Sequence, residues 1–218
     1  MFNRTTLVIL AIAAAVAGLF AGWRVFSPAG DAACPPTQAL KCFETPRMLP
    51  PFELVRHDGQ PLTNESLHGH WTLVFIGFTH CPDICPTTLA QLKVAQKEWE
   101  SLPEASRPRV LFVSVDPERD TPEITGRYAH AFHPDTLAAT GEPQRLANFA
   151  RNLSLVFMKQ PPAADAQANH YSVDHSAALA VIDPQGRMAG VIPPDHASHG
   201  FDPKAIAADF LLLHESRP

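Results

Sequence analysis

The sequence predicts an α/β fold, in which parallel strands alternate with helices. Two continuously apolar runs, residues 74–78 and 110–115, carry the β-branched and aromatic side chains of strands that are buried on both faces. A proline follows each run after a short loop, Pro86 in one case and Pro122 in the other, and proline suits the first turn of a helix. Strand, helix and strand in this order indicate a right-handed parallel crossover.

The first half of the chain supplies the core strands and their helices. Apolar residues of the first helix recur on one side of it, as they do in a helix that packs on a sheet. Thr121 precedes Pro122 and is a good N-cap for the second helix. The elements predicted here are, in order, a strand at 51–55, a strand at 71–78, a helix at 86–101, a strand at 110–115 and a helix at 121–132.

The second half adds further strands and ends in a helix. Asp-Pro-Gln-Gly at 183–186 is a turn between two apolar runs, which predicts an antiparallel hairpin. The elements predicted here are a weak strand at 136–140, a helix at 142–152, a strand at 155–158, hairpin strands at 177–182 and 188–192, and a closing helix from 202 to about 215. Surface loops are expected at 160–169 and 193–201. Thioredoxin-like folds have this order of elements, with reactive cysteines after the first core strand.

Two cysteines lie where the first core strand meets its helix. Cys81 is in the connecting loop, and Cys85 directly precedes Pro86 and is therefore expected at the helix cap. The positive end of the helix dipole lies beside both sulfurs, and such a position lowers the pKa of a thiol. The sequence therefore predicts reactive or metal-binding sulfur here rather than a packing role.

The spacing Cys-x-x-x-Cys is one residue longer than that of disulfide oxidoreductases. The wider loop lets two thiolates reach one metal ion, while a structural disulfide is the plain alternative. Two sulfurs alone suit a soft monovalent ion, whereas a stable divalent site needs a further ligand such as imidazole. In a thioredoxin-like arrangement His175 faces the cysteine loop, at the place of the thioredoxin cis-proline. A capping or surface histidine is the alternative interpretation of His175.

Three motifs resemble the Sco/SenC family. They are FIGFTHCPDICPTTL at 75–89, SVDPERDTPE at 114–123, and DHS at 174–176 with DPQG at 183–186. They occur in the family's order and spacing, and the likeness runs from about residue 52 to 213. Members are membrane-tethered, thioredoxin-fold proteins that assist copper insertion into cytochrome c oxidase. The resemblance implies a thioredoxin-like fold with an added hairpin, and Cys81, Cys85 and His175 as copper ligands.

Two features depart from the family pattern. One is the pair Cys34 and Cys42, and the other is the histidine-rich loop at 195–200. In an exported protein Cys34 and Cys42 are expected to form a local disulfide, or otherwise to act as free thiols that hand metal or electrons to the main pair. His196 and His199 are expected in a solvated loop, with weak accessory metal binding as the alternative.

The amino-terminal region predicts export and a membrane anchor. An apolar run preceded by Arg4 is at the short end for a spanning helix, and a cleaved signal peptide is the alternative. The positive amino end favours a cytoplasmic tail and an exported domain, which in a bacterium faces the periplasm from the inner membrane. The predicted parts are the tail at 1–6, the anchor at 7–26, a Pro/Ala-rich tether at 27–48 and the thioredoxin-like domain at 49–218.

Other polar residues near the cysteines have lesser predicted roles. His80 adjoins Cys81, but neighbouring side chains point apart, so His80 is expected to tune or screen the site rather than to bind metal. Asp83 is expected to keep the loop solvated. Asp116 ends the strand beside the cysteine strand, where its carboxylate either orients His175 or caps the next segment.

Two functions fit these observations, and the net charge of −5 argues against a nucleic-acid partner. The first is a copper metallochaperone that holds Cu(I) on two cysteines, or Cu(II) with the histidine as well, and delivers it to the binuclear copper site of cytochrome c oxidase. Its partners would be the copper-site subunit of the oxidase, the membrane and another copper chaperone. The second is a thiol-disulfide oxidoreductase that reduces the cysteines of that copper site, with Cys81 and Cys85 as the redox pair.

Overall fold

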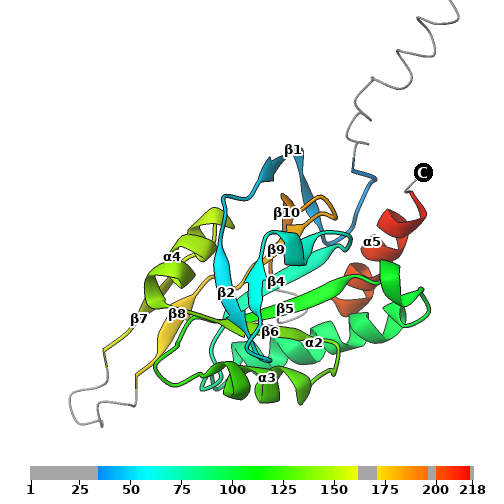
Figure 1. Ribbon diagram of the computed structural model, residues 1–218. Helices are drawn as coiled ribbons and strands as arrows, with labels where there is room; N and C mark the ends of the chain where they lie inside the picture. Colours follow the sequence, from blue (N-terminus) through cyan, green and yellow to red (C-terminus); the bar gives the residue numbers. More distant parts are fainter. Residues whose placement is uncertain (1–33, 162–170, 196–199, 217–218) are drawn as a thin grey trace, which may run out of the picture. The chain divides into compact units, whose positions relative to one another are not determined.

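Figure 1 shows the computed structural model of the chain, which describes residues 34–161, 171–195 and 200–216. The predicted tail, the anchor and the start of the tether lie outside these residues, as do His196 and His199. Within the described ranges, no helix has the length and apolar character needed to cross a membrane. The described residues all belong to one compact unit, which begins at Cys34.

A mixed sheet forms the middle of this unit. Its central strands β4, β5 and β6 run parallel, and the strands that flank them are antiparallel to their neighbours. In spatial order the described strands are β1 (Lys41–Met48), β10 (Arg187–Ile192), β9 (Leu179–Ile182), β4 (Thr72–Gly77), β5 (Arg109–Ser114), β6 (Leu137–Thr140), β2 (Glu53–Arg56) and β3 (Pro61–Thr63). Two further strands, β7 (Phe157–Lys159) and β8 (Val173–His175), pair antiparallel in a small separate sheet.

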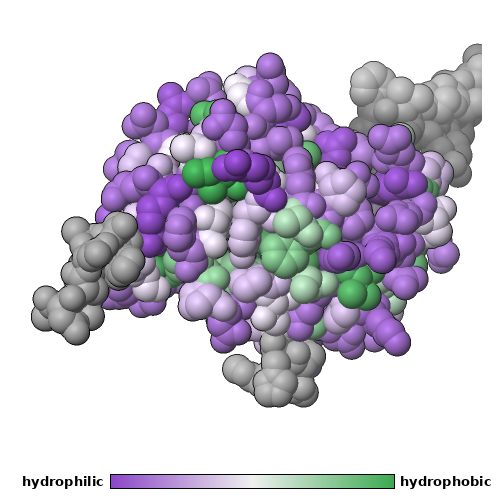
Figure 2. Space-filling view, turned by 90° about the horizontal axis from the view of Figure 1, so that it is seen from below, coloured by the Kyte–Doolittle hydropathy of each residue, from purple (hydrophilic) through white to green (hydrophobic). Residues whose placement is uncertain are grey.

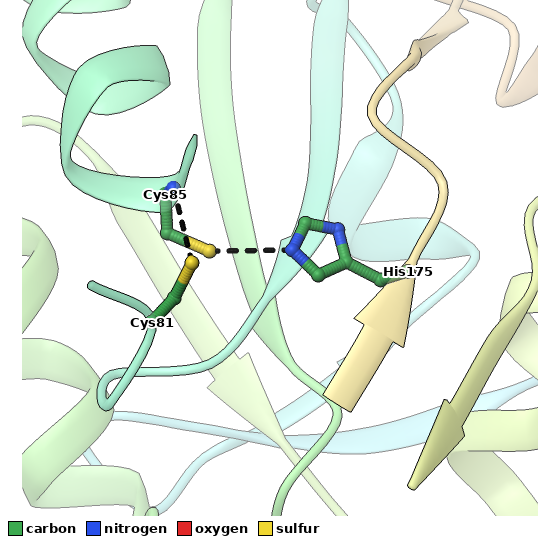
Figure 3. Close-up of side chains that lie close together, drawn as sticks. All are labelled: Cys81, Cys85 and His175. Carbon is green, nitrogen blue, oxygen red and sulfur yellow. Dashed lines mark hydrogen bonds between the residues drawn. The ribbon is translucent and has the colours of Figure 1, made fainter. Parts of the chain in front are cut away.

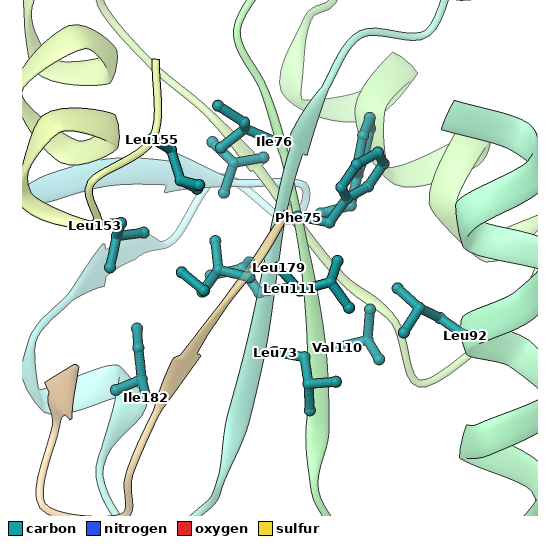
Figure 4. Close-up of a cluster of buried hydrophobic side chains, with 14 of the residues drawn as sticks. Leu73, Phe75, Ile76, Leu92, Val110, Leu111, Leu153, Leu155, Leu179 and Ile182 are labelled. Atoms are coloured by element: carbon teal, nitrogen blue, oxygen red, sulfur yellow. The ribbon is translucent and has the colours of Figure 1, made fainter. Parts of the chain in front are cut away.

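Helices cover both faces of the sheet. The long helix α2 (Ile84–Trp99) packs on the closing helix α5 (Pro203–Glu215), where the rings of Trp99 and Phe210 lie 5.5 Å apart. Helix α3 (Pro122–His130) connects β5 to β6, and α4 (Pro143–Asn152) follows β6. The short 3-10 helices are η1 (Glu65–Leu67) and η2 (Glu104–Ser106). Figure 4 shows Leu92 of α2 on one side of β4 and β5, and Leu153 and Leu155, which follow α4, on the other.

The core is built on β4 and β5, as the two apolar runs predicted. Every residue of β4 is buried, and so is every residue of β5 after its first. The two strands pair in register with Phe75 opposite Phe112, and their ring centroids lie 5.9 Å apart. Side chains alternate between the two faces of a strand, so a run that is apolar at every position can be buried only between two layers. The predicted α/β fold and its parallel crossovers are confirmed.

Helix starts follow the predicted caps except at α2. The Thr121 hydroxyl accepts a hydrogen bond from the Ile124 N–H at 3.3 Å, as an N-cap does. Helix α2 begins at Ile84, two residues earlier than predicted, so Cys85 lies in the first turn and not at the cap. Residues of the first turn donate no N–H within the helix, and this lets Pro86 occupy the third helical position.

The predicted tether is too long at its carboxyl end. Residues 41–48 form β1, which pairs with β10 at the edge of the sheet, so the folded domain does not begin at residue 49. Cys34 and Cys42 form the predicted local disulfide, with 6.3 Å between their Cα atoms. The buried carboxylate of Asp209 accepts hydrogen bonds from three successive backbone N–H groups within that loop, those of Gln38, Ala39 and Leu40, at 2.7, 2.8 and 2.9 Å.

The added hairpin consists of β2 and β3. The chain turns between them at Gly59, whose φ of 79° is the left-handed conformation that glycine adopts without strain. Strand β2 also pairs with β6 and so extends the sheet at the edge opposite β1. The hairpin thereby covers the edge of β6, the outermost of the parallel strands.

Candidate metal centre

The cysteine loop leaves the carboxyl end of β4 and enters α2. The N–H of Cys81 donates to the Phe78 carbonyl at 3.2 Å, which closes a tight turn directly after the strand. In the first turn of α2 the N–H of Cys85 points at Cys81 Sγ, 3.5 Å away. N–H groups of a first helical turn have no partner within the helix, so they are free to face the sulfur. Both thiols are free, with Cys85 buried and Cys81 half-buried.

His175 comes from a distant part of the chain and completes the cluster. It is the last residue of β8, and pairing with β7 sets its position, since His175 lies opposite Phe157. Its Nε2 lies 3.4 Å from Cys85 Sγ, and the two sulfurs and a ring nitrogen all lie within 4.8 Å of one another. Figure 3 shows the ring directed at the two sulfurs, with the cysteines on the opposite side of the site.

The imidazole is oriented by its own strand end and by two aromatic rings. Its Nδ1 lies 3.1 Å from the Ser176 carbonyl oxygen, which can only accept, so Nδ1 carries the proton and the Nε2 lone pair faces the sulfurs. The ring packs edge-on against Phe75 and Phe78, with centroids 5.8 and 6.2 Å away. A metal-binding histidine characteristically has such a partner on its other nitrogen.

Asp116 does not orient His175, so the first of the two roles expected for it is wrong. Its carboxylate is buried and accepts hydrogen bonds from the Tyr171 hydroxyl and from Arg119 Nε, both at 2.5 Å. The guanidinium of Arg119 also lies over the Tyr171 ring, 3.7 Å from its centroid. Tyr171 and Arg119 occupy the carboxylate of Asp116, so Asp116 does not contact the imidazole of His175. The backbone carbonyl of Ser176 is the partner of the imidazole instead.

Burial governs the proton affinities in the site. Desolvation raises the pKa of the Cys85 thiol well above its ordinary value, and the nearby Cys81 and Asp120 raise it further. The expected effect of the helix end, a lowered thiol pKa, is therefore outweighed at Cys85. Burial also lowers the pKa of His175, although the Ser176 carbonyl opposes this. At neutral pH and without metal, the site holds a protonated Cys85 thiol beside a neutral imidazole.

Gly77 is a site residue that the sequence interpretation missed. A Cβ on Gly77 would lie 2.6 Å from Cys85 Sγ and 3.1 Å from Cε2 of Phe112. The sulfur therefore occupies the space that any side chain at position 77 would need. A glycine that interrupts a β-branched and aromatic run is the signal that could have revealed this close approach.

Asp120 is a second residue that was missed, and it holds the start of the cysteine loop. Its fully buried carboxylate accepts hydrogen bonds from the N–H and hydroxyl of Thr79, at 2.8 and 2.5 Å, and from the Ser114 hydroxyl at 2.5 Å. It thus links the end of β5 to the loop that follows β4. From sequence alone, an aspartate in a polar loop is usually interpreted as a turn residue. Only the burial seen in the structure shows that Asp120 has a different role.

The lesser predicted residues lie beside the cluster. His80 is exposed and its Nδ1 faces Asp120, 3.5 Å from the nearer carboxylate oxygen, so it is not among the three clustered ligands. Asp83 is exposed at the N-cap of α2. Among the described residues, no other group of three His, Cys, Asp or Glu side chains brings its ligand atoms this close together.

Two sulfurs and one imidazole nitrogen suit a soft or borderline metal ion such as copper. Fold and site together define a thioredoxin-like α/β protein with a dithiol–imidazole metal centre at the carboxyl end of the central strands. The family model of SCO1/SenC matches residues 43–209 of the chain. The chain belongs to the SCO1/SenC family.

Similar proteins include a mitochondrial SCO2 homolog from Mus musculus, which is 38% identical over 135 residues, or 62% of this chain and 52% of that protein. The chain spans about half the length of this curated relative. The crystal structure of Arabidopsis thaliana ScoI with copper bound superposes with a TM-score of 0.65 at 32% identity, covering 77% of this chain and 98% of that one. The apo Sco1 protein from Thermus thermophilus gives a TM-score of 0.67 at 34% identity, covering 81% and 97%. These structures confirm the thioredoxin-like Sco fold.

Proposed function

We propose that this protein is a copper metallochaperone that binds one copper ion through Cys81, Cys85 and His175. The convergence of these three ligand atoms within 4.8 Å of one another carries the proposal. It is supported by the similar Arabidopsis structure, which has copper bound. Two thiolates alone satisfy Cu(I), and the imidazole adds the nitrogen ligand that Cu(II) favours.

Copper binding at this site must displace protons. The Cys85 thiol is protonated in the absence of metal because burial raises its pKa, so copper has to take the place of its proton. The imidazole, by contrast, is already neutral and has its Nε2 lone pair directed at the sulfurs. The nitrogen ligand is therefore preorganised, and the thiols supply the pH dependence of binding.

The proposed recipient is the binuclear copper site of cytochrome c oxidase during assembly. Half-buried Cys81 is the sulfur that an incoming thiolate could approach, because Cys85 is fully buried. His175 is also partly exposed. A three-ligand centre leaves space for a fourth ligand, as transfer by ligand exchange requires. We extend the proposal to a bacterial inner-membrane protein with its domain in the periplasm, which receives copper from another chaperone.

An anaerobic copper titration of the full chain tests the site. We expect one copper per chain, with thiolate-to-Cu(II) charge-transfer absorption for the oxidised complex. Changing His175→Ala should weaken Cu(II) binding by more than the roughly 10–100-fold typical of losing an outer partner, and Cys81→Ser should abolish it. His214→Ala, on α5, is the matched control and should change nothing. Undiminished Cu(II) binding by His175→Ala would remove His175 from the site.

The adjacency of two free sulfurs favours a second candidate function, thiol-disulfide oxidoreductase. The more exposed Cys81 would attack a disulfide of the oxidase subunit and form a mixed disulfide. Cys85 would then attack Cys81 Sγ, releasing the partner's dithiol and leaving a Cys81–Cys85 disulfide. Two electrons pass to the partner in this exchange.

Restoration of oxidase assembly separates the two functions. Equal loss of assembly with His175→Ala and Cys81→Ser would favour copper delivery, because the imidazole is needed only for the metal. Loss with Cys81→Ser alone would favour thiol reduction. Localisation is tested separately, by protease treatment of cells with intact and with permeabilised outer membranes. Protection that persists after the outer membrane is opened would refute the periplasmic placement.

A further inference from the structure

A cleft at the other end of the sheet gathers three arginines. Strands β5 and β6 begin there, whereas the cysteine loop follows the carboxyl end of parallel β4. The cleft has a volume of about 310 Å³, at the lower end of the range for small-ligand sites. The side chains of Arg56, Arg107 and Arg109 line it, and its wall includes buried Gln96 and Trp99.

These arginines are not neutralised equally. Arg56 pairs with Asp58 at 2.6 Å, and Arg107 donates to the backbone carbonyls of Glu100 and Leu102 at 2.8 and 2.9 Å. Arg109 contacts His70 Nε2 at 2.7 Å. Within the described part of the chain, no carboxylate lies within ion-pair distance of Arg109 or Arg107.

Arg56 and Arg109 place two like charges on the wall of the same cleft. Burial lowers the pKa of Arg109, and the charge of Arg56 lowers it further. Nε of Arg56 is also buried without a hydrogen-bond partner. Like charges that line one cleft are costly, and a bound anion would relieve their repulsion.

Acidic groups at the cleft offset part of this charge but form no ion pair with Arg107 or Arg109. The exposed side chains of Glu104 and Asp135 contribute to the lining, but neither pairs with an arginine. Buried His133 is satisfied within the protein, since its Nδ1 accepts from the Asp135 N–H at 3.2 Å and its Nε2 faces Glu100 at 3.4 Å. Among the described residues that line the cleft, the buried side-chain donor without a partner is Nε of Arg56, and the guanidinium groups of Arg107 and Arg109 have no carboxylate partner.

We infer that this cleft binds a small phosphate-bearing anion, with Arg109 and Arg56 as its principal contacts. The planar fork of a guanidinium matches the oxygens of a phosphate group, and the cavity has room for one such group with a small organic substituent. Free phosphate and the phosphate ester of a lipid headgroup share this chemistry. The site is separate from the metal centre and does not depend on the function proposed for it.

Isothermal titration of the metal-free full chain in neutral detergent tests the inference. The probes are inorganic phosphate and glycerol 3-phosphate, at low salt and at matched ionic strength. We expect saturable binding that weakens at least about tenfold with Arg109→Gln and with Arg56→Gln, the loss expected for one charge-assisted hydrogen bond. Arg127→Gln removes the same charge from an exposed position on α3 and is the matched control, with affinity within about twofold of the native chain.

The comparison of probes identifies the source of the anion. Tighter glycerol 3-phosphate binding points to a headgroup-like ester, and tighter inorganic phosphate binding points to the free ion. If Arg109→Gln does not fold, Arg109→Lys keeps the charge without the fork and should still bind less tightly than the native chain. The inference would be overturned if the native chain showed no saturable binding, or if Arg127→Gln lowered the affinity as much as Arg109→Gln does. In the second case the probes would bind only through general electrostatic attraction to the surface.

Discussion

Gly77 has only a hydrogen atom where other residues carry a side chain, and the sulfur of Cys85 occupies the space that this leaves. The absence of a side chain at position 77 therefore sets how deeply the metal centre is buried. A methyl carbon at position 77 would lie 2.6 Å from that sulfur, far below van der Waals contact, and the sulfur belongs to a helix that cannot easily withdraw. The size of residue 77 therefore determines where the buried ligand lies.

Gly77→Ala should destabilise the protein by about 1–3 kcal/mol, the usual cost of overpacking a core. It should also displace Cys85 and weaken copper binding. Urea unfolding of Gly77→Ala, Cys85→Ala and the double variant measures the coupling between the two positions. The Gly77→Ala cost should shrink in the Cys85→Ala background, because the sulfur is gone. An unchanged cost would show that the clash lies elsewhere.

The lowered pKa of His175 has a consequence for stability. The unfolded chain binds a proton on this imidazole as pH falls through about 6.5, while the folded protein resists protonation until lower pH. The unfolded state then holds more protons, so the stability of the metal-free protein should fall below about pH 6.5 and level off beneath the folded pKa. Urea unfolding between pH 5 and 7.5 measures this.

His175→Gln should flatten that pH dependence without abolishing it. His130 also has a lowered pKa, owing to burial and to the nearby His57, and so contributes in the same direction. The variants His130→Gln, His175→Gln and the double change separate the two contributions. A pH profile that His175→Gln leaves unaltered would contradict the burial of a neutral imidazole.

At the scale of elements, the site depends on how neighbouring strands and loops are fastened to one another. Strand β5 does not contribute a ligand, yet its exit region supplies Asp120, which fixes the loop after β4 through Thr79. Strand β8 places His175 through its pairing with β7 rather than through the main sheet. Ligand positions are therefore set by three separate elements that meet at one end of the sheet.

Asp120→Asn should cost about 1–3 kcal/mol, because the amide cannot accept all three hydrogen bonds and a buried donor loses its partner. Copper affinity should fall as well, because the loop that carries Cys81 is less constrained. Thr79→Val removes only the hydroxyl bond and should show a smaller effect on both measures. Calorimetric unfolding and copper titration of the two variants test this order, and the reverse order would contradict the role of Asp120.

The elements themselves were largely predictable, because local signals determine them. The apolar runs of β4 and β5 and the caps at Thr121 and Asp202 appear where periodicity and proline placement indicated. Strand β1 was not predicted, because an edge strand exposed over much of its length carries little apolar patterning. Its pairing with β10 is a long-range interaction that no local signal reveals.

The site was predictable in composition but not in its supports. The cysteines could be placed from the strand and helix around them, whereas His175 could be placed only through the thioredoxin-like arrangement, and the resemblance to a known family then implied its role as a ligand. Of the two roles expected for Asp116, the one that orients His175 is wrong, because Tyr171 and Arg119 bind the carboxylate. Such competition between polar partners depends on positions in space, which spacing along the chain does not give.

On the scale of the whole molecule, the amino-terminal loop is fastened to the closing helix. Asp209 of α5 is 2% exposed. Its carboxylate accepts hydrogen bonds from three backbone N–H groups of the loop that the Cys34–Cys42 disulfide closes. The start and the end of the described chain are thereby joined on one side of the domain. The polar contact is buried, so each donor needs its acceptor.

Asp209→Asn should destabilise the domain by about 1–3 kcal/mol, because an amide oxygen cannot replace two carboxylate oxygens. Removing the disulfide in the Cys34→Ser/Cys42→Ser variant should cost about 2–3 kcal/mol by loop-closure entropy. Hydrogen exchange at residues 38–40 should accelerate in both variants, while copper binding stays unchanged. Loss of copper binding in either variant would show that the loop also supports the metal centre.

The face of the domain in Figure 2 is mostly hydrophilic, with separate small hydrophobic areas rather than one broad apolar surface. A large contiguous apolar patch usually marks a stable protein interface. Partners that approach from this side would therefore meet mainly charged and polar groups, as suits brief encounters rather than permanent association.

The disulfide also determines how the domain responds to mechanical tension. A pull on Cys34 passes through the covalent bond directly to Cys42, which lies in β1 opposite Gly190 of β10. Residues 35–41 are bypassed by the disulfide and carry none of that force, so their hydrogen bonds to Asp209 are not loaded when the chain is pulled. In the reduced protein the same pull would act on residues 38–40 and their hydrogen bonds to Asp209 before it reached β1.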